Sequence, residues 1–246
     1  MPYPKEEYAL PIQELYTQMN GATSFRPMQQ FQSDTWSARI YRSSGGTLEK
    51  ATCSFLHITK GTINGSPGTI SRFEAVVYPE NPKIPALFIM TDMTETEEMG
   101  SYIVFYSDLI IQDRQSHQRE KNLFATVAQG VCDQHGHSFK DYNEFIVGRG
   151  TFGGNAGECG LMGFFQEKDI PFLEALMRKV VPAYAEILEL NENEHPQDED
   201  HENMYASRAR FVEWMIADSL GTKIMRENSI PLHILEVSSF PPVVKY

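Results

Sequence analysis

The chain has 246 residues, of which 41% are hydrophobic and 22% are charged, a balance typical of a folded globular protein. Its net charge of −12 argues against broad binding to nucleic-acid phosphates, although a pocket in an acidic protein can be locally basic. No apolar run reaches the roughly 18 residues of a membrane helix. The polar, acidic N-terminus does not resemble a signal peptide, and the three cysteines lack CxxC spacing. We therefore expect a cytoplasmic protein that binds neither nucleic acid nor a membrane.

The first half of the chain has the periodicity of strands. It begins with a helical segment at residues 1–25, in which Pro11 marks a possible break. The stretches that follow are rich in β-branched and aromatic side chains, and several alternate in polarity. They predict strands at residues 35–44, 51–63, 72–78, 86–93 and 101–111. The strands at 72–78 and 86–93 flank a proline-rich turn and predict a hairpin.

The second half has helical periodicity instead. Leu123, Val127 and Val131, for example, lie four residues apart and so share one helix face. Helices are predicted at residues 114–136, 138–147, 168–190 and 204–220, an acidic connector at 191–203 and a last strand at 232–237. We therefore expect a single domain over residues 1–246, of the α+β class, with an antiparallel β-sheet flanked by α-helices.

The predicted hairpin has one carboxylate on each strand, Glu74 and Asp92. Strand carboxylates most often face water. If either instead lies beside apolar walls, its pKa rises and it becomes a candidate acid or base near neutral pH. Whether Glu74 and Asp92 face water or the interior depends on the register of the hairpin, because a slip of one residue turns each side chain to the opposite face.

Three other motifs have more than one interpretation. In "SRARFVEW", Arg210 can pair with Glu213 on a helix surface, or an arginine can clamp a substrate carboxylate, and both remain open. "GTFGGNAG" lacks the Lys-Ser/Thr of a P-loop, which favours a flexible loop near a site. "CDQHGH" has metal-capable side chains without the usual ligand spacing, so we predict no metal site.

Six stretches, in a shared order over residues 31–246, resemble oxygen-dependent coproporphyrinogen III oxidases. They are SGGTLEKATCSF, VVYPENPKIP, SDLIIQD, CGLMGFFQEKD, SRARFVEWMIADSLGTK and LEVSSFPPVVKY. Several polar positions of the family differ here. The His-Pro of the family is Tyr78-Pro79, and the first acid of its Phe-Phe-Asp-Asp is Gln166.

This resemblance implies an α/β/α sandwich that forms a homodimer and a site without metal or organic cofactor, in which O2 is the co-substrate. It predicts an oxidoreductase that performs oxidative decarboxylation or desaturation. The substrate would be an electron-rich small molecule with a carboxylate, either a tetrapyrrole or another aromatic. The catalytic candidates are Asp92, Glu74, Glu167 and Asp108. The substrate-binding candidates are Arg72, Arg208, Arg210 and Gln166.

A second resemblance is shorter. "VVYPENPKIPALFIMTD" is similar to ferredoxin-dependent bilin reductases, with Asp92 at about the aspartate that protonates the bilin and Glu74 where some members have a histidine. It implies an alternative function, the reduction of a linear tetrapyrrole with electrons from ferredoxin. Docking of an acidic donor on this acidic chain would need a local basic patch. A further alternative is a tetrapyrrole-binding protein without turnover.

Overall fold

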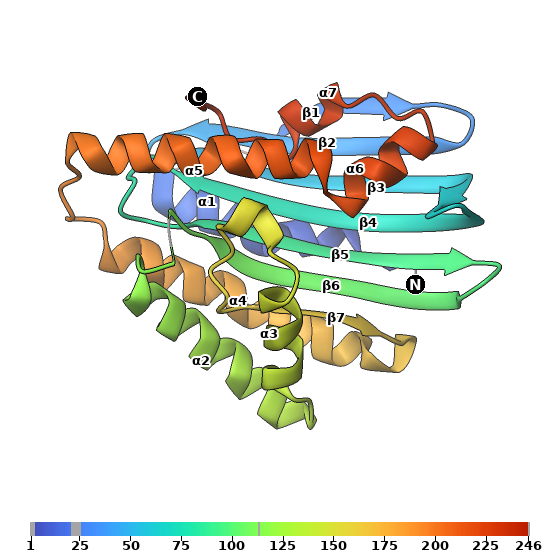
Figure 1. Ribbon diagram of the computed structural model, residues 1–246, viewed down its shortest axis with the longest axis horizontal. Coiled ribbons are helices and arrows are strands. Elements are labelled where there is room, and N and C mark those ends of the chain that lie inside the picture. The colour runs from blue at the N-terminus through green and yellow to red at the C-terminus, as the bar shows by residue number, and fades with distance from the viewer. Residues whose placement is uncertain (1–2, 21–25, 113, 246) are drawn as a thin grey trace.

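The computed structural model describes residues 3–20, 26–112 and 114–245; residues 1–2 and 21–25 of the predicted N-terminal segment lie outside the described residues. Within these ranges, seven strands form one sheet, each antiparallel to the next, in the order of the chain (Figure 1). The strands are β1 (Arg26–Gln32), β2 (Trp36–Gly45), β3 (Leu48–Ile63), β4 (Ser66–Pro79), β5 (Ala86–Thr96), β6 (Gly100–Ile110) and β7 (Leu161–Phe165).

Helices cover both faces of this sheet. They are α1 (Leu10–Asn20), α2 (Gln118–His135), α3 (Phe139–Val147), α4 (Ile170–Leu190), α5 (Asp198–Ala217), α6 (Leu220–Glu227) and α7 (His233–Val237). In Figure 1, α5, α6 and α7 lie in front of the sheet and α1 and α4 lie behind it. The predicted α+β class, an antiparallel sheet flanked by helices, is confirmed. None of the described helices is both long and apolar enough to cross a membrane.

Alternation along the strands divides the interior into two cores. On β4, Phe73, Ala75 and Val77 pack with α1, α2 and α4, while Val76 packs with α5, α6 and α7. Successive side chains of a strand point to opposite faces, so the even-numbered residues of β4 belong to the second face. The same face therefore receives the side chain of Glu74.

The predicted last strand is wrong, because residues 233–237 form the short helix α7. Ile234 and Leu235 of this helix are buried in the core between the sheet and α5–α7. The segment therefore packs across the sheet face instead of joining an edge.

The acidic connector is shorter than predicted, because α5 begins at Asp198 and includes residues 198–203. Gln197 precedes the helix, and the side chain of Asp200 accepts a hydrogen bond from the Gln197 backbone N–H at 2.7 Å. Acidic residues in a first helical turn also interact favourably with the positive end of the helix dipole. The charges that resemble a solvated loop in sequence therefore start a helix.

Candidate functional site

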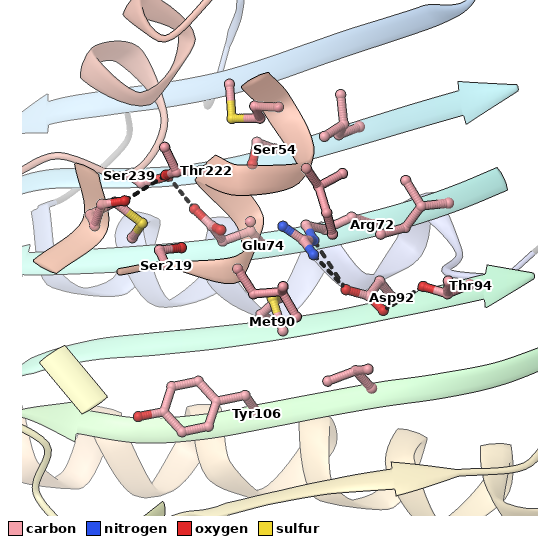
Figure 2. A pocket seen from close by; sticks show the side chains of 18 of the residues that line it. Ser54, Arg72, Glu74, Met90, Asp92, Thr94, Tyr106, Ser219, Thr222 and Ser239 are labelled. Carbon is pink, nitrogen blue, oxygen red and sulfur yellow. Dashed lines mark hydrogen bonds and ion pairs between the residues drawn. The ribbon is translucent and has the colours of Figure 1, made fainter. Parts of the chain in front are cut away.

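A cavity of about 560 Å³ lies between the sheet and helices α5–α7 (Figure 2). Its volume falls within the roughly 300–1,000 Å³ of small-molecule sites. Most of the wall area is apolar, and polar side chains reach it from the strands, from α6 and from the surrounding loops. Met99, Phe164 and Leu220 line it and are themselves exposed, which marks its opening to solvent.

The hairpin of β4 and β5 places three charged side chains in this cavity. Arg72 is directly opposite Asp92, and Glu74 is opposite Met90. All three charged residues line the cavity, and Figure 2 shows them together above the sheet. The register therefore puts both hairpin carboxylates on the inner face and not toward water.

Arg72 and Asp92 form an ion pair on the cavity wall. The Nε and Nη2 atoms of Arg72 donate to Oδ2 of Asp92 at 3.1 and 2.8 Å. Thr94 donates from Oγ1 to the other carboxylate oxygen at 3.2 Å. The Asp92 side chain is 3% exposed and that of Arg72 is 12% exposed. The charge of Arg72 is thus already compensated from within the protein.

Among the residues that the structure describes, Glu74 has no cationic partner at hydrogen-bonding distance. Its carboxyl accepts a hydrogen bond from the hydroxyl of Ser239 (Figure 2). Burial raises the pKa of Glu74, and the hydroxyl of Ser239 and the positive charges of Arg72 and Lys50 oppose this only in part. A carboxyl with a raised pKa beside apolar walls is suited to act as a general acid.

Polar side chains of the sheet hold the segment that carries Ser239. Lys50 Nζ donates to the carbonyl oxygens of Glu236, at 3.2 Å, and of Phe240. Thr52 and Tyr78 donate to the carbonyls of residues 238 and 239 at 2.6 and 2.7 Å. Burial lowers the pKa of Lys50 to about 7, and Arg42 contributes to this. The C-terminal segment is therefore a fixed part of the cavity wall.

The structure places Asp108 outside the cavity lining. Its buried carboxylate accepts hydrogen bonds from the backbone N–H groups of Glu158, Cys159 and Gly160 at 3.0–3.2 Å. Burial raises the pKa of Asp108 to about 6, although these hydrogen bonds oppose the shift. A Cβ at Gly160 would lie 1.7 Å from the carbonyl oxygen of Ser107, so this close approach requires glycine. These contacts attach the loop before β7 to β6.

The two candidate arginines of α5 also lie away from the cavity lining. Arg208 is 4% exposed, pairs with Glu49 at 2.8 Å and donates to the carbonyl of Pro79 at 3.1 Å. Arg210 donates to Asn155 Oδ1 at 3.2 Å and to the carbonyl of residue 112 at 3.1 Å. Arg208 connects α5 to β3 and β4, Arg210 connects α5 to two loops, and the structure brings neither guanidinium group to Glu74.

Gln166 and Glu167 are exposed and do not line the cavity. Gln166 instead caps the 3₁₀ turn at Glu167–Asp169 that leads into α4. The residues of "CDQHGH" serve packing as well, since the His137 ring stacks on Phe172 with centroids 3.9 Å apart. In the described ranges, no group of three or more His, Cys, Asp or Glu side chains could hold a metal ion.

Several cavity residues were not singled out from the sequence. Tyr106 and Tyr102 follow the same period-two pattern on β6 as Asp108, so alternation alone could have assigned them to this face. Thr151 belongs to GTFGGNAG, which the sequence predicts to be a loop near a site, whereas no pattern in the sequence indicates that Ser239 lines the cavity.

Comparison of the chain with protein-family models finds no match, and comparison with curated proteins finds no similar sequence. The function of the chain is therefore inferred from the cavity and from the two resemblances of its sequence.

Proposed function

We propose that this protein is an oxidoreductase that reduces a conjugated, largely apolar molecule of the linear tetrapyrrole class, with Glu74 as proton donor. The observation that carries the proposal is the position of the Glu74 carboxyl group on the wall of a largely apolar cavity, beside the Arg72–Asp92 pair. Burial at this position raises the pKa of Glu74. The shorter of the two resemblances also puts proton-handling residues on this hairpin, but its protonating aspartate corresponds to Asp92, which is paired with Arg72 here, so we assign the proton to Glu74 instead.

The charges of the cavity favour this reaction over decarboxylation of a polycarboxylate. A substrate with several carboxylates needs several free cations, because a buried, unpaired charge is unfavourable. Of the predicted anchors, Arg208 and Arg210 lie outside the cavity lining and Arg72 is paired with Asp92. The conjugated body of a bilin needs none of these cations, and its carboxylates, two propionates in biliverdin, would extend through the cavity opening into water.

The proposed reaction balances with two electrons and two protons, which convert one carbon–carbon double bond of the substrate into a single bond. An external one-electron donor of the ferredoxin type supplies the electrons in two steps. Glu74 donates the first proton, is reprotonated from solvent through the cavity opening, and then donates the second. The apolar walls strengthen the electrostatic effect of Arg72 and Asp92 on the charge that develops in the substrate.

One exposed residue of each charge, Arg149 and Asp218, lines the cavity. Arg149 is the positive charge that would contact an acidic electron donor there. The three cysteines are buried free thiols, as suits a reducing compartment such as the cytoplasm.

The first test is an anaerobic titration with biliverdin, a linear tetrapyrrole, followed by absorbance and then by addition of reduced ferredoxin. We expect a shifted spectrum and conversion to a reduced bilin. Glu74→Gln should bind with similar affinity but react about 10²- to 10⁴-fold more slowly, the usual contribution of a general acid. Glu95→Gln, an exposed carboxylate on the same strand as Asp92, is the matched control. Equal rates in wild type and Glu74→Gln would contradict the assignment.

A second candidate is the O2-dependent oxidation of a substrate that places one of its carboxylates at Arg72. The guanidinium group of Arg72 lines the cavity, and a substrate carboxylate that displaced Asp92 would be held there. Oxygen uptake and CO2 release with coproporphyrinogen III would favour this reaction. A bilin spectrum without turnover under either condition would instead indicate a tetrapyrrole-binding protein.

A further inference from the structure

Two buried hydroxyl groups face the cavity without hydrogen-bond partners. Tyr106 is 3% exposed and Thr151 is 7% exposed, and both residues line the cavity. The Tyr106 Oη and Thr151 Oγ1 atoms make no hydrogen bond to the part of the chain that the structure describes. The Thr151 hydroxyl is near enough to lower the pKa of Tyr106 in the way a hydrogen-bond partner does, but the two oxygens do not meet the distance and angle of a hydrogen bond with each other.

Buried polar groups in proteins are nearly always satisfied, so two unpartnered hydroxyls on one cavity wall indicate a ligand group or a water molecule. The Tyr106 ring is held in place by aromatic neighbours. Its centroid is 5.7 Å from that of Phe88 and 5.2 Å from that of Phe152. The hydroxyl cannot move far to find another partner, because packing restrains the ring.

The strand register relates these hydroxyls to Glu74. Glu74 is opposite Met90, and Met90 is opposite Tyr106, so the three residues form one row across β4, β5 and β6 (Figure 2). Neighbouring strands are about 4.8 Å apart, which puts the Cα atoms of Glu74 and Tyr106 about 10 Å apart. An extended, flat ligand lying over Met90 can contact both ends of the row.

We infer that Tyr106 and Thr151 form a subsite that binds a neutral carbonyl group, such as that of a lactam, at the end of the ligand remote from Glu74. This inference deepens the proposed function, on which it rests for the identity of the whole ligand. The two hydroxyls supply two donors, and a carbonyl oxygen accepts two hydrogen bonds.

A neutral group fits this subsite better than a carboxylate. The negative charge of Asp108 is near enough to raise the pKa of Tyr106 further, in addition to the effect of burial. An anionic ligand group would be repelled by Asp108 at the same position. A carbonyl avoids this repulsion and still accepts hydrogen bonds from both hydroxyls.

The test compares two fragments of nearly equal size by NMR titration: oxindole, which has a lactam carbonyl, and indole, which does not. We expect wild type to bind oxindole about five- to tenfold more tightly, and Tyr106→Phe and Thr151→Val to lose this preference. Tyr184→Phe is the control, since its hydroxyl donates to the carbonyl of Pro85 on the other side of the sheet. Equal binding of the two fragments to wild type, no binding of either, or a preference retained in both variants would overturn the inference.

Measurements of biliverdin binding and reduction distinguish a failure of this inference from a failure of the proposed function. If biliverdin is reduced but binds Tyr106→Phe and Thr151→Val as tightly as wild type, the subsite is wrong and the proposed function stands. If oxindole is preferred through Tyr106 while biliverdin does not bind, the subsite stands and the proposed function is wrong.

Discussion

The Glu74→Gln variant tests whether the pKa of Glu74 is raised in the folded protein. The test needs no substrate, because a raised pKa makes the free energy of unfolding depend on pH. The raised pKa means that the folded protein retains the Glu74 proton at pH values where the unfolded chain has lost it. As pH rises from the ordinary value of 4.5 to the raised value in the folded state, the wild-type free energy of unfolding therefore falls. The fall for one group is at most about 1.4 kcal/mol per pH unit. Glutamine has no such proton and still offers an oxygen to Ser239.

We therefore expect Glu74→Gln and wild type to have similar stability at pH 4, and the variant to become progressively more stable than wild type as pH rises. The gap becomes constant above the raised pKa. Each kcal/mol corresponds to a difference of about 2–4 °C in Tm for a chain of this size. Urea unfolding at a series of pH values measures the gap directly.

The difference in the free energy of unfolding between Glu74→Gln and wild type does not contain the contribution of other titrating groups, because both proteins have them. The pKa of Asp108 is raised from 3.8 to about 6, but this group is present in both proteins and cancels in the difference. Glu95→Gln on the solvent-exposed part of β5 should show no gap that grows with pH. A gap that does not change with pH, or one that reverses, would mean that Glu74 is ionised in the folded protein and would refute its role as a neutral acid.

Three further predictions concern the neighbouring charges. Asp92→Asn should lower the free energy of unfolding by about 2–3 kcal/mol, because it leaves the guanidinium of Arg72 uncompensated, and Arg72→Met with Asp92→Leu should recover most of this loss in urea unfolding. Asp108→Asn should lower the free energy of unfolding by about 2–4 kcal/mol at pH 4 and by less at pH 8. The loss is smaller at pH 8 because wild type is itself less stable there, once Asp108 has lost its proton. A larger loss at pH 8 than at pH 4 would contradict the raised pKa of Asp108. Arg208→Met should lower Tm through loss of the ion pair with Glu49 and leave biliverdin affinity unchanged, whereas a weakened affinity would place Arg208 in the site.

Local sequence was sufficient to predict much of this fold. Alternating and β-branched stretches predicted β2 to β6, and four-residue spacing predicted α2 to α4, because side-chain direction repeats every two residues in a strand and every 3.6 in a helix. The same period of two places Arg72 and Glu74 on one face of β4 without any knowledge of the rest of the chain. The chemistry of the hairpin could therefore be proposed from the sequence.

The tertiary structure decided which of the candidate residues share the cavity. Arg208 and Arg210 lie on one helix, but their partners, Glu49 and Asn155, are 159 and 55 residues away in sequence, and no local pattern specifies such contacts. The hydrogen bond from Ser239 to Glu74 likewise joins residues 165 positions apart.

The tertiary structure also decided that Glu74 and Asp92 lie on the same face of the sheet. Asp92 lies beside Arg72 only because β4 and β5 pair in this register, and a slip of one residue would have turned it to the opposite face. Local periodicity determines which side chains share a face of one strand. The register between strands, set by the packing of both cores, determines which charges from different strands meet.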